Sequence, residues 1–519
     1  MSKKYKWAAS LCAATLMATL ISGCGSGTSN NETQTGKDSK EKVSFSFFAK
    51  FPNTYQQIMK DYNDNIVYQE LEKETGVHIN WVHPPENQMQ EKFTLMIGSG
   101  DYTDLIQDDN SYPGGPDKAI QDKVYLRLNE LIDEHAPNFK KILDTYPEIK
   151  KEITTDEGNI YGFPMIELEQ QPAWYGPVIR QDWLDELNLP TPETLDDWYT
   201  VLKAFKDKKG ATAPFSLDNN GYPANDAFVG AFGVNSGFFQ VDNIIKYAPL
   251  EQGYKDYLVM MNKWYSEGLV DRDFATSGNQ NKEKYLATGK TGATMFGFYE
   301  LDRLEKISGD PKMKLVAMPY PSLKKGEKPH FRQYNGHIRG NYVAISSKAK
   351  HVEEAVKWLD YFYSPEGQVL ANYGIEGETY TKEGDKYLFT DIVTKNKEGV
   401  KPNIALAKYT LQGASTVRDW SREMFLYTQT ENEACSIWND SATADYLLPP
   451  FTMNPAEGEE NSKIMSDINT YVSEMALRFI IGDASFDTYD QFVQKVKSMN
   501  IDRAIELQQA ALDRYQARK

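Results

Sequence analysis

Five short loops of the sequence place aromatic rings beside planar polar side chains, at residues 171–175, 238–240, 296–300, 332–335 and 417–420. A sugar ring has apolar C–H faces that rest on an aromatic ring, while its hydroxyl groups bind amides, carboxylates and guanidinium groups. The chain also contains 9 Trp, 32 Tyr and 24 Phe, which is more rings than the packing of a core requires. These residue types therefore predict a saccharide-binding site.

The predicted site takes its members from all five loops. The ligand-binding candidates are Trp174, Tyr175, Phe238, Tyr299, Tyr334, Asn335, Arg418, Asp419 and Trp420. Arg418 and Arg332 would suit a carboxylate, and hence a uronate-bearing saccharide, because a guanidinium group can donate two parallel hydrogen bonds to it. Arg418 beside Asp419 could equally be a structural ion pair, and any single ring could instead pack in a core or a hinge.

The sequence offers little for catalysis or for a resident metal. A glycosidase needs two carboxylates that converge on one bond, but pairs such as Asp182 and Asp185 fall on a helix surface, where solvation explains them. Residues 288–291 resemble the end of a phosphate-binding loop, yet the preceding Gly-x4-Gly is missing. The six histidines show no metal spacing, and no His-Glu-x-x-His, Cys-x-x-Cys or Gly-x-Ser-x-Gly occurs. We therefore expect no catalytic residue, no cofactor and no metal.

Length and charge narrow the class of protein. A chain of 519 residues exceeds what one hydrophobic core usually serves, so we expect more than one core-bearing unit. The net charge of −17, from 57 basic and 74 acidic residues, repels phosphate backbones and argues against a nucleic-acid partner. Three cysteines cannot build a disulfide framework, and Cys435, close to Ile437 and Trp438, is expected to be inert packing.

The first 24 residues have the pattern of an export signal. Three lysines precede an apolar run of about 15 residues, shorter than the roughly 20 that a membrane span needs. Residues 20–24, Leu-Ile-Ser-Gly-Cys, resemble the lipobox of bacterial lipoproteins, which implies cleavage after residue 23 and a lipid on Cys24. Residues 25–42 are polar throughout and typical of a flexible tether. We expect a signal peptide at 1–23, a lipidated tether at 24–42, and an extracytoplasmic protein anchored to the cell membrane.

Hydrophobic periodicity predicts alternating strands and helices in the first part of the chain and longer amphipathic helices later. The expected strands are 43–48, 77–82 and 104–106, and the expected helices are 66–75, 88–98, 194–205, 254–265, 352–362 and 501–515. The alternation is typical of an α/β fold with a largely parallel sheet. Two β-rich joints, 160–164 leading into 174–179 and 315–319 leading into 342–345, are positions where a two-lobed chain could cross between its lobes.

Several segments resemble, in order, passages of the solute-binding proteins of ABC importers. They are residues 93–105, 156–164, 179–187, 354–367 and 373–377. Two examples are Asn-Ile-Tyr-Gly-Phe-Pro at 159–164 and Arg-Gln-Asp-Trp-Leu-Asp-Glu-Leu at 180–187. Together with the lipobox, they resemble extracellular solute-binding protein family 1, and in particular its long lipoprotein branch of LplA-type and alginate-oligosaccharide-binding proteins.

The resemblance implies an α/β fold of the periplasmic-binding-protein type, with two lobes, hinge strands and a central ligand cleft. One lobe would take residues 43–165 plus 316–380, and the other 170–313 plus 400–519. It also implies a monomeric, non-enzymatic, lipid-anchored protein that captures an oligosaccharide and delivers it to the transmembrane permease subunits of an ABC importer. A lipoprotein that binds peptides or signal molecules is the alternative hypothesis, and an exported carbohydrate-active enzyme is the third.

One loop departs from the pattern of this branch. Many members carry an Asp-rich loop, resembling a calcium-binding loop, after the helix that corresponds to residues 202–206. Here residues 207–215 offer one carboxylate beside two lysines, whereas a calcium ion needs about six to eight oxygen ligands. Residues 218–221, Asp-Asn-Asn-Gly, are more typical of a turn. We therefore predict no calcium site in this loop.

Overall fold

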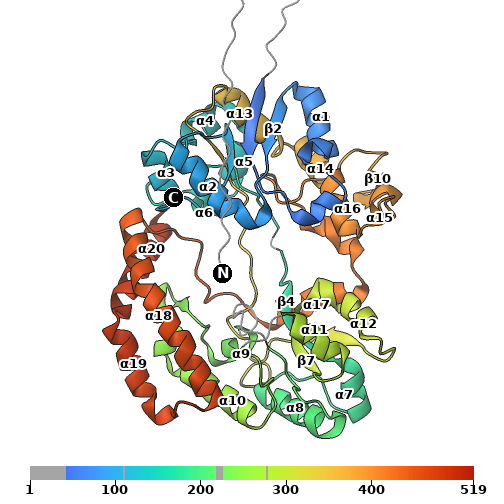
Figure 1. Cartoon of the computed structure of the whole chain (residues 1–519), viewed down its shortest axis with the longest axis vertical. Helices are drawn as coiled ribbons and strands as arrows, with labels where there is room; N and C mark the ends of the chain where they lie inside the picture. The colour runs from blue at the N-terminus through green and yellow to red at the C-terminus, as the bar shows by residue number, and fades with distance from the viewer. Residues whose placement is uncertain (1–42, 109–110, 170, 218–225, 276–278, 519) are drawn as a thin grey trace, which may run out of the picture. The chain divides into compact units, whose positions relative to one another are not determined.

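The computed structural model describes residues 43–108, 111–169, 171–217, 226–275 and 279–518. The predicted signal peptide, the tether with Cys24 and the turn at 218–221 lie outside the described residues. Two large hydrophobic clusters organise the described chain, and each surrounds its own sheet. Figure 1 shows the helices of the first core around β2 and those of the second core around β4 and β7.

The first core surrounds a four-stranded sheet in the order β2, β1, β3, β9. These strands are β1 (Ser44–Phe48), β2 (His78–Val82), β3 (Leu105–Gln107) and β9 (Val343–Ile345). β1 is parallel to β2 and β3, whereas β9 runs antiparallel to β3. Phe45 and Phe47, at alternate positions of β1, are buried in the core. The three predicted strands are present within one residue of their expected positions, and the predicted parallel pairing is confirmed.

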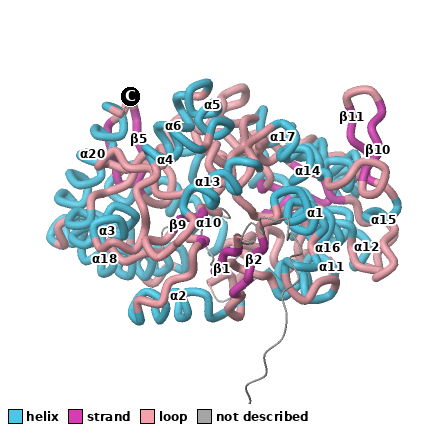
Figure 2. The backbone as a smooth tube through the Cα atoms, turned by 90° about the horizontal axis from the view of Figure 1, so that it is seen from above, coloured by secondary structure: helices cyan, strands magenta, loops and turns pink. Residues whose placement is uncertain are grey.

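Helices complete the first core and its surroundings. Those of the first core are α1 (Ile66–Thr75), α4 (Asn129–His135), α5 (Pro137–Thr145), α6 (Pro147–Ile153), α13 (Val352–Tyr361) and α14 (Pro365–Tyr373). Two more, α2 (Met89–Ser99) and α3 (Gly115–Gln121), pack with Phe48 and Ile106 of the sheet in a smaller cluster, and α16 (Pro402–Tyr409) packs in another with Tyr373. The Asn65 side chain accepts a hydrogen bond from Val67 N at 2.9 Å, which caps α1. Figure 2 shows the hairpin of β10 (Tyr380–Glu383) and β11 (Lys386–Phe389) beside α14 and α15 (Asp391–Thr394).

The second core surrounds the antiparallel sheet β7–β4–β8, formed by β7 (Ala293–Gly297), β4 (Tyr175–Arg180) and β8 (Leu315–Ala317). Its main helices are α7 (Gln181–Leu187), α8 (Leu195–Lys209), α10 (Gln252–Ser266), α11 (Asn279–Ala287), α12 (Leu301–Ser308), α17 (Gln429–Ser441), α18 (Pro455–Ile481), α19 (Tyr489–Ser498) and α20 (Ile501–Ala517). Trp198, Trp264 and Trp438 are almost fully buried in this core. The helices predicted at 194–205, 254–265 and 501–515 correspond to α8, α10 and α20.

Three stretches connect the two cores, and we call them the crossing segments: residues 166–169 with 171–173, 331–343 and 416–427. They pair through their backbones. Ile166 N donates to Thr416 O at 2.8 Å, and Arg418 N donates back to Ile166 O at 2.7 Å. On the other side, Glu167 N donates to His337 O at 2.8 Å. The first crossing segment therefore lies between the other two.

The boundaries of the two cores differ from those expected for the lobes. β8 pairs with β4, and Met318 and Phe331 pack in the second core, so residues 316–331 do not join the first core. Leu411 and Val417 pack in the first core, so the chain returns to the second core later than residue 400. The expected lobes placed the third crossing between residues 380 and 400, whereas it lies at 416–427, because pairing between distant segments leaves no mark in local periodicity. That each core moves as a separate lobe stays a prediction.

Cys435 lies in the second core, buried as expected for an inert thiol. Burial raises the pKa of its thiol to about 12, because a thiolate would lose its hydration there. The thiol is therefore protonated at neutral pH and not activated as a nucleophile.

The close approach of β4 to α17 yields a stability prediction. A Cβ atom on Gly176 would lie 2.5 Å from Trp438 Nε1, and that nitrogen donates to Pro177 O at 3.2 Å. Gly176→Ala should therefore lower the free energy of unfolding by about 1–3 kcal/mol, measured by urea denaturation. Gly98→Ala is the matched control, because this helical glycine has nothing within 4 Å of the added Cβ. Equal midpoints for the two variants would contradict the packing described here.

Candidate functional site

The candidate site begins where the parallel strands of the first sheet end. β1 ends at Phe48 and β3 at Gln107, and Lys50 N donates to Gln107 Oε1 at 2.9 Å. Binding sites of open α/β sheets lie outside the carboxyl ends of parallel strands, because the loops that follow neighbouring strands meet there. This edge of the first sheet is therefore the place to look for ligand contacts.

A cavity of about 270 Å³ opens at this edge. Polar and aromatic side chains line it, including those of Lys50, Tyr55, Tyr62, Gln107, Asn341, Gln412 and Arg418. Gln107 Nε2 donates to Asn341 Oδ1 at 2.8 Å, which fixes the orientation of both amides. A neighbouring cavity of about 690 Å³ shares Tyr55 and Gln412 with the first and extends the lining to Tyr427.

A group of rings from the second core adjoins these cavities, and we call it the ring group: Trp174, Tyr175, Phe298, Tyr299 and Tyr427. Antiparallel pairing places Tyr175, at the start of β4, opposite Gly297, at the end of β7. The rings of Trp174 and Tyr299 stack with their centroids 6.3 Å apart. The ring of Phe298 meets that of Tyr427 edge-on at 4.7 Å, and Tyr427 lines the larger cavity. The structure thus brings together three predicted residues, Trp174, Tyr175 and Tyr299.

Backbone contacts hold the ring group in position. Trp174 N donates to Gln333 Oε1 at 2.8 Å, and Trp174 O accepts from Phe298 N at 3.0 Å. The Tyr320 hydroxyl donates to Tyr175 O at 2.7 Å and accepts from Gln333 N at 3.0 Å. A Cβ atom on Gly297 would lie 2.6 Å from the Tyr299 ring, so glycine is needed for this ring position. Sequence reasoning missed Tyr320 and Tyr427, which lie outside the five aromatic loops.

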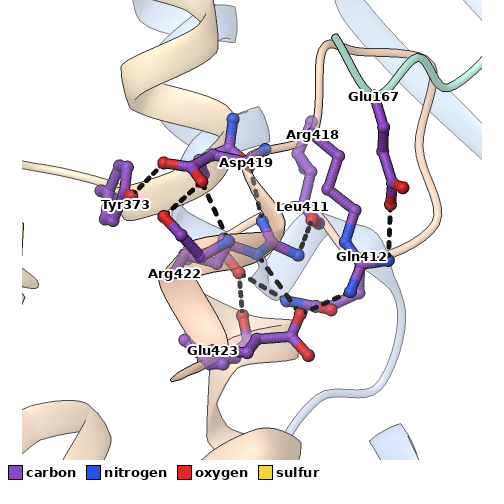
Figure 3. Close-up of polar contacts among 12 residues, drawn as sticks. Glu167, Tyr373, Leu411, Gln412, Arg418, Asp419, Arg422 and Glu423 are labelled. Carbon is purple, nitrogen blue, oxygen red and sulfur yellow. Dashed lines mark hydrogen bonds and ion pairs between the residues drawn. The ribbon is translucent and has the colours of Figure 1, made fainter. Parts of the chain in front are cut away.

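Charged side chains from all three crossing segments form a second group, the hinge cluster: Glu167, Arg339, Arg418, Arg422 and Glu423. Figure 3 shows Arg418 between the two carboxylates. Its Nη1 lies 3.2 Å from Glu167 Oε1, and its Nη2 lies 2.9 Å from Glu423 Oε1. Arg422 Nε is 3.4 Å from the same Glu423 oxygen, and Arg339 Nε is 3.9 Å from Glu167 Oε1. The ion pairs therefore connect the same segments that the backbone hydrogen bonds pair.

Burial and neighbouring charges shift the pKa values of this cluster in different directions. Burial raises the pKa of Glu167, and its arginine neighbours offset only part of that cost. Burial opposes the charge of Arg418, but the Glu423 and Glu167 carboxylates outweigh it and raise the pKa of Arg418. Burial also opposes ionisation of Glu423, yet Arg418 and Arg422 lower its pKa below the ordinary value. Glu423 is therefore ionised at neutral pH and balances two arginines.

Asp419 and Trp420 have other surroundings than the sequence suggested. Asp419 does not pair with Arg418. Its carboxylate accepts from Ser421 N at 3.0 Å and from the Tyr373 hydroxyl, and so caps the short helix η7 (Trp420–Leu426). Trp420 is half-buried at the start of η7 and does not line the two cavities described above. A ligand contact for either residue stays a prediction.

The remaining predicted residues lie elsewhere. Phe238 and Tyr334 line a separate hollow of about 940 Å³, so the structure does not group them with Trp174. Asn335 Nδ2 donates to Gln171 Oε1 at 2.8 Å, which joins the first and second crossing segments. Among the described residues, no three His, Cys, Asp or Glu side chains gather in a way that could hold a metal ion. No described helix is long and apolar enough to cross a membrane.

Comparison with known proteins assigns the family. Residues 49–369 match the sequence profile described as bacterial extracellular solute-binding protein, and this match covers more than half of the chain. The chain belongs to this family. As a bacterial extracellular solute-binding protein it is a non-enzymatic component of solute transport, and the resemblance found in the sequence is confirmed.

Full-length relatives support the assignment. The chain is 27% identical over 497 residues to the fructooligosaccharide ABC transporter substrate-binding protein FusA of Streptococcus pneumoniae serotype 4, covering 89% of each chain. It is 25% identical to the polygalacturonan/rhamnogalacturonan-binding protein YtcQ of Bacillus subtilis, covering 92% of this chain and 93% of YtcQ.

A solved structure supports the fold. The crystal structure of the alginate-binding protein AlgQ2 without calcium ion matches with a TM-score of 0.70 and 25% identity, covering 91% of this chain and 98% of AlgQ2. The predicted α/β fold of the periplasmic-binding-protein type is thereby confirmed.

The hinge cluster yields a pH-dependent stability prediction. Glu423→Gln should lower the free energy of unfolding by about 3 kcal/mol at pH 7, because it leaves Arg422 buried without its carboxylate. Since the folded-state pKa of Glu423 is lowered, its contribution is present above the ordinary carboxyl pKa and is lost as the pH falls through the lowered value. The gap between wild type and variant, measured by urea denaturation, should therefore shrink as the pH falls below the ordinary carboxyl pKa.

Glu459→Gln is the control for this variant. The Glu459 side chain is 72% exposed and pairs with Lys463 on the surface of α18, where solvent screens the interaction. The control should keep the wild-type urea midpoint across the same pH range. A Glu423→Gln variant as stable as wild type at pH 7 would show that the hinge cluster does not stabilise the fold.

Proposed function

We propose that the chain captures an oligosaccharide between the ring group and the adjoining cavities, and delivers it to the permease of an ABC importer. The observation that carries the proposal is the stacked pair of Trp174 and Tyr299. Tyr299 follows Phe298, whose ring meets Tyr427 in the lining of the larger cavity. The adjoining smaller cavity is lined by fixed amides such as Gln107 and Asn341. Rings for the sugar faces and planar polar groups for the hydroxyls are the two requirements of a saccharide site. The names of FusA and YtcQ point to the same ligand class.

Binding on this proposal is coupled to movement about the crossing segments. The rings belong to the second core, whereas Gln107 and Lys50 belong to the first, so an oligosaccharide that contacts both sides favours the arrangement in which they are close. No bond is made or broken. A dissociation constant of about 1 µM corresponds to about −8 kcal/mol, which a few ring contacts and hydrogen bonds can supply.

The proposed location follows from the family and the N-terminal sequence. The family is extracellular, and the lipobox at residues 20–24 supports a lipid on Cys24 that anchors the protein to the cell membrane. A protein anchored there would capture the ligand outside the cytoplasmic membrane, where a permease would receive it. The permease would interact with the protein, and ATP would be hydrolysed by another subunit.

A thermal-shift screen of the purified protein against plant and bacterial oligosaccharides tests the proposal. A ligand at about 100 times its dissociation constant stabilises the native state by about 2.7 kcal/mol, which gives a Tm shift of a few degrees. A selective shift without turnover of the glycan supports oligosaccharide capture. A flat response from folded, ligand-free protein, together with a shift from a peptide library, would favour a peptide receptor. Product formation would favour an enzyme.

The ring group yields a binding prediction. Trp174→Ala and Tyr299→Ala should each weaken the affinity for the oligosaccharide found in the screen about five- to tenfold, because a stacked ring contributes about 1–1.4 kcal/mol. Isothermal titration calorimetry measures the change. Phe425→Ala is the matched control, since Phe425 and Tyr299 are both 44% exposed but Phe425 packs against Phe389 at 5.3 Å. Wild-type affinity in both ring variants would remove the ring group from the site.

A further inference from the structure

The structure separates the two arginines that the sequence offered as partners for a ligand carboxylate. Arg418 already binds two carboxylates of its own chain, Glu167 and Glu423. Arg332 forms no salt bridge with any Asp or Glu in the described part of the chain. Of the two, Arg332 is therefore the one whose charge is available to a ligand.

Arg332 is buried, so the absence of a carboxylate partner lowers the stability of the fold. The residue is 8% exposed, its Nη1 donates to Gln333 O at 3.1 Å, and its Nε has no acceptor among the described residues. Burial lowers the pKa of the Arg332 guanidinium, because the charged form loses hydration. A buried cation without a counter-ion destabilises a fold, and such groups are normally paired. A ligand with a negative charge would supply the missing partner.

Arg332 lines the hollow of about 940 Å³ that also contains Phe238 and Tyr334. The Arg332 guanidinium carbon lies 5.9 Å from the centre of the Tyr334 ring, and that ring is exposed. A guanidinium group beside an exposed ring is the combination that suits an acidic sugar, since the ring takes the C–H face and the guanidinium group takes the carboxylate. The hollow is also larger than one sugar unit needs, so it can admit more than one.

The other charged groups of the hollow do not satisfy Arg332. Asp440 and Asp445 are exposed, and the Asp445 carboxylate binds Thr443 Oγ1 at 2.9 Å and lies 3.3 Å from His330 Nδ1. Burial raises the pKa of Glu152, which disfavours a negative charge on that side chain. Lys328 is exposed and adds a second positive charge to the lining. Arg332 is thus the buried cation of this lining.

The hollow is connected to the ring group through one residue. Gln333 lies between Arg332 and Tyr334 in the chain, and its side chain accepts the hydrogen bond from Trp174 N at 2.8 Å. A ligand held by Arg332 would therefore rest against the same crossing segment that positions Trp174. A ligand in the hollow could therefore affect the position of Trp174 through Gln333.

We propose that the hollow beside Arg332 binds the carboxylate of an acidic saccharide, with Tyr334 against the face of the same sugar. This inference rests on the proposed function, because it names the substrate class that the oligosaccharide site takes. It assigns Arg332 and Tyr334 as the residues that select a uronate over a neutral sugar. The ring group would bind the remainder of the chain of sugars.

The test compares acidic oligosaccharides with their carboxyl-reduced counterparts, which keep the sugar rings but lose the charge. Oligogalacturonides and alginate oligosaccharides are the probes, titrated into the full chain by calorimetry. Wild type should bind at least one acidic probe at least tenfold more tightly than its reduced form. Arg332→Met should remove that preference and leave the affinity for the reduced form within about twofold. Lys328→Gln, which removes an exposed charge from the same hollow, should keep the preference at 0.15 M salt, where exposed charges are largely screened.

A stability measurement separates ligand recognition from a structural role. Because Arg332→Met removes a buried, unpaired charge, its Tm without ligand should equal or exceed that of wild type. A lowered Tm together with equal losses for acidic and reduced probes would make Arg332 structural and overturn the inference. Wild-type binding of neutral oligosaccharides with no preference for acidic ones would also overturn it, but would leave the proposed function intact. Failure of every saccharide would overturn both.

Discussion

The pairing of the three crossing segments is the constraint on which both halves of the site depend. The amides and Lys50 stand on the first sheet and the rings on the second, so contacts between the two halves set the distance between them. These contacts include the crossing segments and the ion pairs of Arg514 and Arg518 with Asp156. Backbone hydrogen bonds join Ile166 to the third segment and Glu167 to the second. The hinge cluster then adds ion pairs between the same segments. A change in that pairing would move the rings relative to the amides without altering either core.

Arg332 and Arg418 show how the surroundings of an arginine determine whether its charge is paired inside the protein. Arg418 has carboxylates on both sides and belongs to the internal balance of charge in the hinge. Arg332 lies in the second crossing segment, is buried, and donates a hydrogen bond to a backbone carbonyl. The first arrangement satisfies the guanidinium group inside the protein, and the second leaves capacity for something outside it.

Local sequence patterns predicted much of this fold. Features that depend on pairing between distant segments could not be predicted. The apolar stripe of α1 with Gly76 as its end, the alternation in β1 and the order of family motifs were sufficient for the elements and the fold class. The sequence singled out Trp174, Tyr175 and Tyr299 because each has polar neighbours, and the structure places these three rings together. The pairing of β8 with β4 and of Arg418 with Glu167, 251 residues away, depends on the assembled chain. For the same reason the sequence did not reveal that Asp419 caps η7 and accepts a hydrogen bond from the Tyr373 hydroxyl.

Because the chain crosses three times between the cores, the crossings also limit the order in which the two cores can fold. The edge of the first sheet joins Gln107 to Asn341, which are 234 residues apart in the sequence, and Leu411 and Val417 pack in the same core. The second core up to Phe331 lies between these parts, so neither core is made of one continuous stretch. Contacts of such long range form slowly and leave apolar surface exposed meanwhile. A chain that emerges from its N-terminus therefore cannot close its first core until most of its residues have followed.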